Sequence, residues 1–523
     1  MNTEKSSKSN RPPTPHWIQQ EVVIVGAGFA GLCMAIKLKE EGINDFLLLE
    51  KAAEVGGTWR DNHYPGAACD VQSHLYSFSF APKNNWSKRY ANWEEIQSYL
   101  LQVTADYQLR PHLRLQQEMI AARFDVKTGR WQVETQSGEH YRCRFLVVAT
   151  GPLHHPHIPR IPGINRFAGT QFHSANWDHR YDFTNKRVIS VGTGASAIQY
   201  APEIAARVAH LSIFQRTPAW VIPRDSRPYT PWERQMLEMQ DWYRRLYRAR
   251  LYWSNESRLW PAKRPALARS IQQLLKLWVR WQVHDGGLAS QLIPDYTFGC
   301  KRVLISNAWY PMFNRSNVQL VTEGIREIRK HSVVTWDSRE HPVDCIIWGT
   351  GFQVDPRSQL QHMPIHGLPG HELLRDWRRG CQAYLGVMVS GYPNFFQLLG
   401  PNSVLGHNSL VFMIEAQVHF IIQCLRMVRE QGSDYFQVKP EVQKIFNHQV
   451  QQELAGSVWQ TGCQSWYQDS EGKNYTLWPW STWRFWLKTR EVHTQDFVFS
   501  RVRAIKTVRT VSGRVIQGPR ERV

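Results

Sequence analysis

The chain has 523 residues, too many for one hydrophobic core, so two or three domains are expected. Hydrophobic residues make up 42% and charged residues 20% of the sequence, as in an ordinary globular protein. The formal net charge of +19 would suit a nucleic-acid or membrane partner, but no nucleic-acid-binding motif accompanies it. We therefore expect the charge to attract anionic cofactors. The 23 tryptophans suggest a large apolar cavity in addition to ordinary core packing.

The N-terminus, the cysteines and the apolar segments exclude several protein classes. Residues 1–20 are rich in Ser, Lys, Asn and Pro and are predicted to be a disordered leader rather than a signal peptide. The eight cysteines include no C-x-x-C pair, which argues against a zinc ribbon and a redox dithiol and fits reduced cytoplasmic thiols. We expect no metal site. Polar residues interrupt the most apolar segment, Val411–Val428, so we predict a buried amphipathic helix and no transmembrane segment.

A first nucleotide-binding turn follows the leader. The β-branched strand Glu21–Val25 leads into Gly26, Gly28 and Gly31, with a helix expected over Leu32–Glu41. In this spacing the first glycine permits a tight turn, the second lets a pyrophosphate approach, and the third allows close packing of helix on strand. The helix N-terminus then presents its partial positive charge to the phosphates.

Two further strands complete this predicted domain. Phe46–Glu50 ends in Glu50, about 20 residues after the turn, where a carboxylate binds a ribose hydroxyl. Phe145–Gly151 is a buried strand that ends in a turn of small residues, where the chain is expected to cross to a second domain. Strand, turn, helix, strand and terminal acid together predict a dinucleotide site far more strongly than the glycines alone.

The segment 167–178 lies between this turn and a second glycine-rich turn, and it fits the pattern F-x-G-x-x-x-H-x-x-x-W-[P/D]. It resembles the fingerprint of the type I Baeyer–Villiger monooxygenases, which are class B flavin-dependent monooxygenases. Its place between two nucleotide sites favours a hinge or relay. The alternative is a surface loop in which His and Trp only cap and pack. The defining positions are Phe167, Gly169, His173, Trp177 and Asp178.

The resemblance implies that the first site holds FAD, wrapped by residues 56–59 and 64–70. Asp70 is expected beside the active site, the alternative being a capping role after the Pro-Gly turn. The family often carries Arg where this chain has Ala68. The positions expected to contact the flavin cofactor are Thr58, Trp59, Arg60, Asp61, Asp70 and Tyr76.

The second turn follows the strand Arg187–Val191 and consists of Gly192, Thr193, Gly194, Ala195, Ser196 and Ala197. Ala197 replaces the third glycine, which such turns tolerate.

The next strand, Leu211–Thr217, ends without the acid that would mark an NAD site, and Gln215 and Arg216 stand in its place. Arg216 and Thr217 are expected to bind the coenzyme. A cation at this place accommodates the 2′-phosphate of NADP, so NADPH is the predicted coenzyme. The alternative is an ordinary surface arginine. Residues 344–352 resemble the second closing turn of the family, with Gly349 where Ala is usual.

Residues 224–290 are rich in Trp and Arg and predict a helical insertion with two apolar faces. A basic amphipathic helix can lie on a membrane. Packing of these faces onto a neighbouring domain is favoured here, giving a lobe that shapes the substrate pocket. One face consists of Trp232, Met236, Met239, Tyr243 and Leu246, and the other of Leu267, Ile271, Leu274 and Trp278.

Phe298–Arg302 supplies two candidate cations. By resemblance, Lys301 helps to bind NADP and Arg302 lies beside the flavin, where Asp70 would orient it. A guanidinium remains protonated and donates several hydrogen bonds, which suits an anionic peroxyflavin. The alternative is a Lys-Arg pair on a solvated loop.

The sequence thus predicts an α/β protein with two Rossmann-like dinucleotide-binding domains, for FAD and NADPH, and a helical insertion. The implied enzyme is a cytoplasmic Baeyer–Villiger monooxygenase that uses NADPH and dioxygen to convert a small-molecule ketone to an ester or lactone through a peroxyflavin. The expected FAD-binding domain is 21–151 with 381–498, the NADPH-binding domain 152–223 with 291–380, the insertion 224–290 and a basic tail 499–523.

Three alternative functions fit less well. An N- or S-oxygenating flavin monooxygenase shares both nucleotide sites, but its fingerprint usually ends in an aromatic residue other than the Trp found at Trp177. A flavin disulfide reductase shares the two-site plan but needs a C-x-x-C pair, which is absent. A nucleic-acid-binding protein would explain the charge and none of the motifs.

Overall fold

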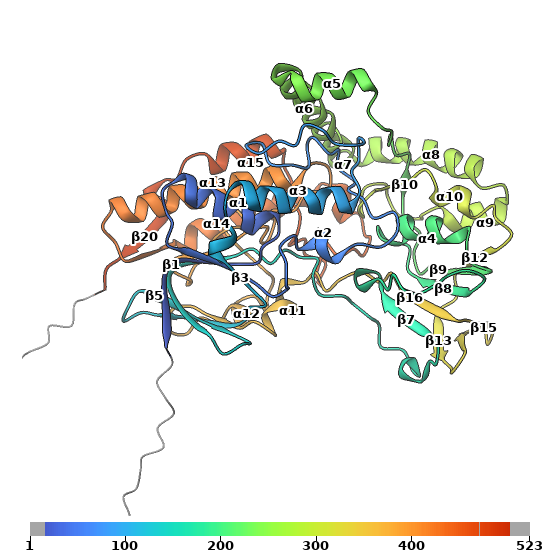
Figure 1. Ribbon diagram of the computed structural model, residues 1–523, viewed down its shortest axis with the longest axis horizontal. Coiled ribbons are helices and arrows are strands. Elements are labelled where there is room, and N and C mark those ends of the chain that lie inside the picture. Colours follow the sequence, from blue (N-terminus) through green and yellow to red (C-terminus); the bar gives the residue numbers. More distant parts are fainter. Residues whose placement is uncertain (1–15, 470, 503–523) are drawn as a thin grey trace, which may run out of the picture.

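The computed structural model describes residues 16–469 and 471–502 and builds them around two mainly parallel sheets (Figure 1). The predicted α/β class is confirmed. The larger sheet runs in the order β17 (Ile365–His366), β4 (Met119–Asp125), β5 (Arg130–Thr135), β6 (His140–Val148), β1 (Trp17–Val25), β2 (Phe46–Glu50) and β3 (Leu113–Leu115), with β18 (Phe395–Gln397) also pairing with β6. The second sheet runs β12 (Val318–Val321), β9 (His210–Phe214), β8 (Arg187–Val191), β16 (Cys345–Trp348) and β7 (Thr170–His173).

Shorter strands and the helices cover these sheets. The remaining strands are β10 (Val221–Ile222), β11 (Leu304–Ile305), β13 (Ile325–Ile328), β14 (Ser332–Thr335), β15 (Glu340–Pro342), β19 (Tyr435–Val438) and β20 (Phe497–Ser500). The α-helices are α1 (Phe29–Glu40), α2 (Thr58–Asp61), α3 (Trp93–Asp106), α4 (Ala197–Ala205), α5 (Pro231–Met239), α6 (Asp241–Glu256), α7 (Leu259–Lys263), α8 (Pro265–Gln282), α9 (Gly286–Leu292), α10 (Trp309–Met312), α11 (Pro356–Leu360), α12 (Leu373–Asp376), α13 (Leu410–Glu430), α14 (Pro440–Ala455) and α15 (Thr482–Thr489).

The central strands are continuous apolar runs. Every residue of β2 and of β16 is buried, as expected for parallel strands covered on both faces. The predicted bounds of β2 and β8 agree with the structure, whereas β1 begins four residues earlier than predicted, at Trp17. Helix α1 begins at Phe29, directly after the glycine turn, rather than at Leu32.

The chain returns to the first sheet earlier than the predicted boundary at residue 380. Ile365 of β17 pairs with Ala122 of β4, and Trp377 packs in the same core. Likewise β1 takes in part of the expected leader, and β20 pairs with β19 within the expected tail. The rest of the predicted leader and tail, 1–15 and 503–523, lies outside the described residues.

Helix α13 is the long apolar helix expected near residue 411. Among the described helices, only α13 is long and apolar enough to cross a membrane, yet 72% of its most apolar 18-residue stretch is buried within the protein. It packs against α1 and α15, so the prediction of a buried helix is confirmed.

The insertion forms a helical lobe, α5 to α9, and α5 and α6 project from the body (Figure 1). The prediction that its apolar faces pack onto a neighbouring domain is only partly right. Ile271 and Trp278 of α8 are partly buried, and Trp278 packs against Tyr310. The side chains expected to pack but found largely exposed are Trp232, Met239, Leu246, Leu267 and Leu274.

One pair of cysteines contradicts the expectation that all eight are reduced. Cys300 and Cys463 form a disulfide with their Cα atoms 6.3 Å apart, within the range for such a bond. The other six are free and buried. The two partners are separated by 163 residues, so only the tertiary fold brings them together.

The structure explains why Gly349 stands where the family usually has Ala. A Cβ atom there would lie 2.6 Å from the hydroxyl of Tyr200 on α4. That hydroxyl forms a buried hydrogen bond of 2.8 Å with the Ser190 hydroxyl on β8. The glycine therefore leaves room for a hydrogen bond between strand and helix.

We expect Gly349→Ala to lower the free energy of unfolding by about 1–3 kcal/mol, because the tyrosine hydroxyl must move. The same change in a Tyr200→Phe background should cost clearly less, since the colliding atom is gone. Urea unfolding of the four proteins measures both costs. An equal cost in the two backgrounds would show that Tyr200 is not the obstacle.

Candidate active site

A cavity of about 1610 Å³ opens between the two sheets and receives the turns that follow their parallel strands. Ligands in such folds bind beyond the carboxyl ends of the strands. Of the residues predicted to bind cofactors, only Gly31 and Ala197 do not line the cavity. Those that do are Gly26, Gly28, Glu50, Thr58, Trp59, Arg60, Asp61, Asp70, Tyr76, Gly192, Thr193, Gly194, Ala195, Ser196, Arg216, Thr217, Lys301 and Arg302.

The glycine turns have the geometry that a dinucleotide needs. Gly26 adopts a φ of +102°, and a Cβ atom there would lie 2.7 Å from the Ala149 carbonyl oxygen. A Cβ atom on Gly31 would lie 1.8 Å from the Gly26 carbonyl oxygen, so Gly31 serves helix packing as predicted. At Gly194 nothing lies within 4 Å, which leaves the second turn open to the cavity. Both turns therefore fit a bound pyrophosphate.

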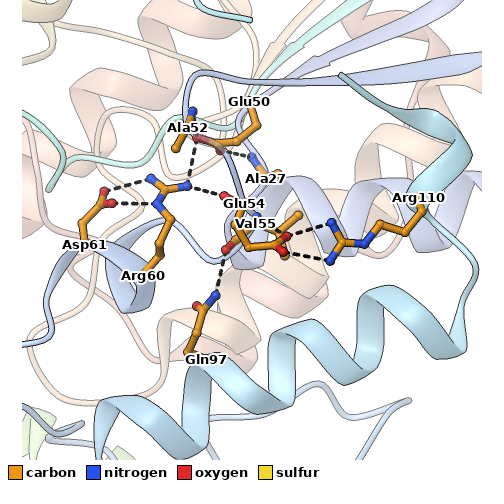
Figure 2. Close-up of polar contacts among 9 residues, drawn as sticks. All are labelled: Ala27, Glu50, Ala52, Glu54, Val55, Arg60, Asp61, Gln97 and Arg110. Atoms are coloured by element: carbon orange, nitrogen blue, oxygen red, sulfur yellow. Dashed lines mark hydrogen bonds and ion pairs between the residues drawn. The ribbon is translucent and has the colours of Figure 1, made fainter. Parts of the chain in front are cut away.

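Glu50, predicted to bind a ribose, is already held by several donors (Figure 2). Its carboxylate accepts from the amides of Ala27 at 2.9 Å and Ala52 at 3.0 Å and from Arg60 at 3.0 Å. Arg60 also binds the Asp61 carboxylate through two hydrogen bonds, of 2.8 and 3.1 Å. Burial lowers the pKa of Arg60, but the bonds to Asp61 and the charge of Glu50 outweigh it and leave the pKa raised. This network fixes α2 against the first turn.

Trp59 and Tyr76 form an aromatic part of the cavity wall. The indole of Trp59 donates to the Tyr76 hydroxyl at 3.3 Å, and the two rings meet edge to face. Phe29, the first residue of α1, packs edge-on against Tyr76. The segment expected to wrap the flavin and the helix that follows the first glycine turn thus contribute to one aromatic cluster.

Asp70 and Arg302 form an ion pair within the cavity, although they come from loops 232 residues apart. The charge of Asp70 raises the pKa of Arg302, outweighing the opposite effect of burial. The guanidinium is therefore a permanent cation. Arg224 donates to the Cys69 carbonyl at 2.9 Å and so supports the Asp70 loop from behind.

Two cations meet at the other end of the predicted coenzyme site. Arg216 follows β9, and Lys301 lies close enough that the charge of Arg216 adds to burial in lowering the pKa of Lys301. The charge of Asp295 acts in the opposite direction but more weakly. Gln215 is turned away and donates to the Gln291 carbonyl at 2.8 Å. Arg216 is thus the side chain presented to the cavity where an NAD site would have its acid.

None of the five fingerprint residues lines the cavity. His173 lies one layer behind it, where its Nε2 bonds to the Gly351 carbonyl at 2.9 Å and its Nδ1 accepts from the Ala175 amide at 3.1 Å. These partners assign the proton to Nε2. Burial lowers the pKa of His173, which favours this neutral form. Because Gly351 does line the cavity, His173 fixes part of the wall without touching a ligand.

Three other fingerprint positions have structural roles. The ring of Phe167 covers Gly169, where a Cβ atom would lie 2.5 Å from that ring. Trp177 packs against Tyr200 and, at 6.5 Å between ring centroids, against Tyr64 of the wrapping segment 64–70. The fingerprint therefore connects the second domain to the segment that ends in the ion-pair carboxylate.

Asp178, the fifth fingerprint position, acts only locally. Its carboxylate accepts from the backbone amide of Arg180 at 3.0 Å, and this hydrogen bond lowers the pKa of Asp178. Asp178 therefore stabilises the turn that follows it.

Sequence reasoning missed several supporting residues. Gln199 of α4 bonds to the Tyr64 hydroxyl at 3.1 Å and to the Ala68 carbonyl at 3.0 Å. Tyr467 lies near Arg302, whose charge acts on it, and it shares a loop with the disulfide partner Cys463. These residues come from separate elements and carry no local motif, so the sequence offers no signal for them.

Comparison with known proteins gives this site a family. A family model described as "Pyridine nucleotide-disulphide oxidoreductase" matches residues 23–241. The chain is 41% identical over 495 residues to a Baeyer–Villiger monooxygenase of Pseudomonas aeruginosa, covering 94% of this chain and 93% of that protein. It resembles a solved steroid monooxygenase bound to NADP, with a TM-score of 0.84, 29% identity and coverage of 92% and 100%. It also resembles OTEMO in complex with FAD and NADP, with a TM-score of 0.84, 25% identity and coverage of 92% and 99%. The chain belongs to the Baeyer–Villiger monooxygenases, as its fingerprint predicts.

Proposed function

We propose that the Asp70–Arg302 pair is the catalytic centre and that the cavity holds FAD along the first sheet and NADPH along the second. The chain is an FAD-dependent Baeyer–Villiger monooxygenase that consumes NADPH and dioxygen. Its substrates are ketones, which it converts to esters or lactones in the cytoplasm. The observation that carries the proposal is the partly buried ion pair that lines the cavity together with the two glycine turns.

The residues present fit both cofactors. The first turn, the Glu50–Arg60 network and the Trp59–Tyr76 wall would hold FAD. The second turn and the Arg216–Lys301 cations would hold NADPH, whose extra phosphate needs positive charge. Once bound, the flavin supplies the activation of dioxygen after reduction by the nicotinamide.

The role of the chain is to place charge and exclude water. Arg302 keeps its proton at every relevant pH and faces the cavity, so it offers a preorganised positive charge to negative charge that develops during oxygen transfer. Asp70 fixes the direction of the guanidinium. Apolar side chains of α13, Val411 and Ile414, line the same cavity and reduce the water around the pair, which strengthens its field.

Removing Arg216 should alter coenzyme choice. A charge-assisted contact to phosphate contributes about 1.5–3 kcal/mol. Arg216→Ala should therefore reduce kcat/KM for NADPH about tenfold or more while leaving NADH nearly unaffected. Steady-state kinetics with both coenzymes measures this. Arg207→Ala, an exposed arginine of the same domain outside the cavity, is the matched control. Equal losses with the two coenzymes would refute the assignment.

Removing Arg302 should separate the two halves of the reaction. Arg302→Ala should still bind FAD and still be reduced by NADPH, because hydride transfer needs only correct stacking. Ester formation should fall by about two to three decades, with NADPH oxidation continuing and releasing hydrogen peroxide. Rapid-mixing spectra and product analysis on one sample measure both halves. Arg302→Lys keeps the charge and should retain part of the ester yield. Near wild-type yield from Arg302→Ala would place the active site elsewhere.

His173 should act through conformation rather than chemistry. His173→Ala removes the bond to Gly351 and should retain FAD but lose most turnover. His173→Gln keeps a donor and should recover part of the activity. Flavin absorbance, thermal unfolding and turnover of the three proteins test this. An unfolded or flavin-free His173→Ala protein would show that the segment is merely structural.

A further inference from the structure

We propose that the outer side of the helical lobe binds the surface of an anionic lipid bilayer. The Trp-rich surface consists of exposed apolar side chains on α5, α6 and α15, each 42–67% exposed. They are Trp232, Met239, Trp242, Leu246, Trp253, Trp483, Trp486 and Leu487. Large exposed apolar patches of this kind mark interaction sites.

On helix α6, large apolar side chains face outward. Trp242, Leu246 and Trp253 follow a spacing of four and seven residues, which places them on one stripe of the helix, and this stripe faces outward. The buried side is mixed, with Leu251 buried beside Asn255 and Glu256, and with Tyr243 and Tyr247 packed against the apolar core. Asn255 donates to the Gln72 side chain at 2.9 Å there. A helix that packs one side against the protein and exposes a stripe of tryptophan and leucine on the other is suited to meet an apolar medium outside.

The neighbouring helices continue this stripe. Trp232 of α5 packs edge-on against Tyr243 of α6, whose neighbour Trp242 is exposed. At the other end of α6, the Tyr252 hydroxyl bonds to that of Thr482 at 2.8 Å, which joins α6 to the start of α15. The apolar side chains of three helices therefore form one surface rather than separate spots.

The positive charge of the lobe indicates which partner binds the Trp-rich surface. Residues 231–292 hold eleven Arg or Lys and five Asp or Glu. On the helical wheel Arg245 and Arg250, both exposed, lie on either side of the α6 stripe. Tryptophan beside arginine is the composition of side chains at a lipid headgroup boundary, and each cation adds attraction to anionic lipid. A second copy of this chain would face like charge with like charge.

The same lobe also forms part of the cavity wall. Pro261 and Ala262 of α7 and Ile271 and Leu275 of α8 line the cavity. One element therefore connects the Trp-rich surface with the site. If the proposed function holds, a ketone dissolved in the bilayer would meet the enzyme at this lobe.

Vesicle co-sedimentation of the full chain tests the proposal independently of catalysis. Vesicles of phosphatidylcholine with phosphatidylglycerol are compared with pure phosphatidylcholine, at low salt and at high salt. We expect binding to the anionic vesicles, weakened by salt because exposed charges are screened. The triple variant Trp242→Gln, Leu246→Gln, Trp253→Gln and the double variant Arg245→Glu, Arg250→Glu should each lower the partition coefficient about tenfold or more.

Trp336→Gln is the matched control, since this tryptophan is 67% exposed and directly follows β14. The strands that pair with β14, β13 and β15, lie far from α5 and α6 in Figure 1. It should bind like the parent protein. Circular dichroism and flavin content verify that each variant is folded. Equal binding to neutral and anionic vesicles, or unchanged binding of the triple variant, would overturn the proposal. A different outcome would also overturn the proposal: a parent protein that binds no lipid but sediments as a dimer, together with a triple variant that sediments as a monomer. That result would assign the Trp-rich surface to a second copy of the chain.

Discussion

The ion pair between Asp70 and Arg302 is the constraint on which the site depends, because it requires loops from both domains to meet. Each loop has its own support. Arg224 holds the backbone beside Asp70, and the Cys300–Cys463 disulfide ties the loop of Arg302 to a C-terminal loop. A charge pair set in a cavity between two nucleotide turns gains strength from the reduced water around it. Position and protonation of the guanidinium thus follow from tertiary contacts rather than from the loop itself.

The fingerprint acts behind the cavity. His173 holds the closing turn of the second domain, and Trp177 packs against Tyr64 of the flavin-wrapping segment. A movement of the second domain would therefore shift the segment that carries Asp70. We propose that this connection, through packed rings and one hydrogen bond, lets the fingerprint act as a relay although its side chains do not line the cavity.

The helical lobe carries apolar side chains both toward the cavity and toward the outside of the protein. Its inner residues line the cavity, while α6 turns Trp242 and Trp253 outward and packs Leu251 and Asn255 inward. The apolar spacing along α6 is visible in the sequence, but spacing alone cannot tell an inward stripe from an outward one. That decision depends on the partners available to the opposite side. Here the side that carries Leu251 and Asn255 packs against the protein, and Gln72 of the first domain gives Asn255 a buried hydrogen-bond partner.

Local patterns determined the elements and both nucleotide turns. The runs that form β2 and β8 were predictable to the residue because each is a short, mainly apolar strand that ends at its own acid or glycine turn. The steric need for glycine at the turns, and the cation in place of an acid at Arg216, are likewise local. The family resemblance implied that Asp70 would meet Arg302, whereas only the tertiary structure decided that Cys300 would meet Cys463. It also decided which side of α6 is buried, because these outcomes depend on contacts between segments far apart in the chain, and no residue spacing encodes them.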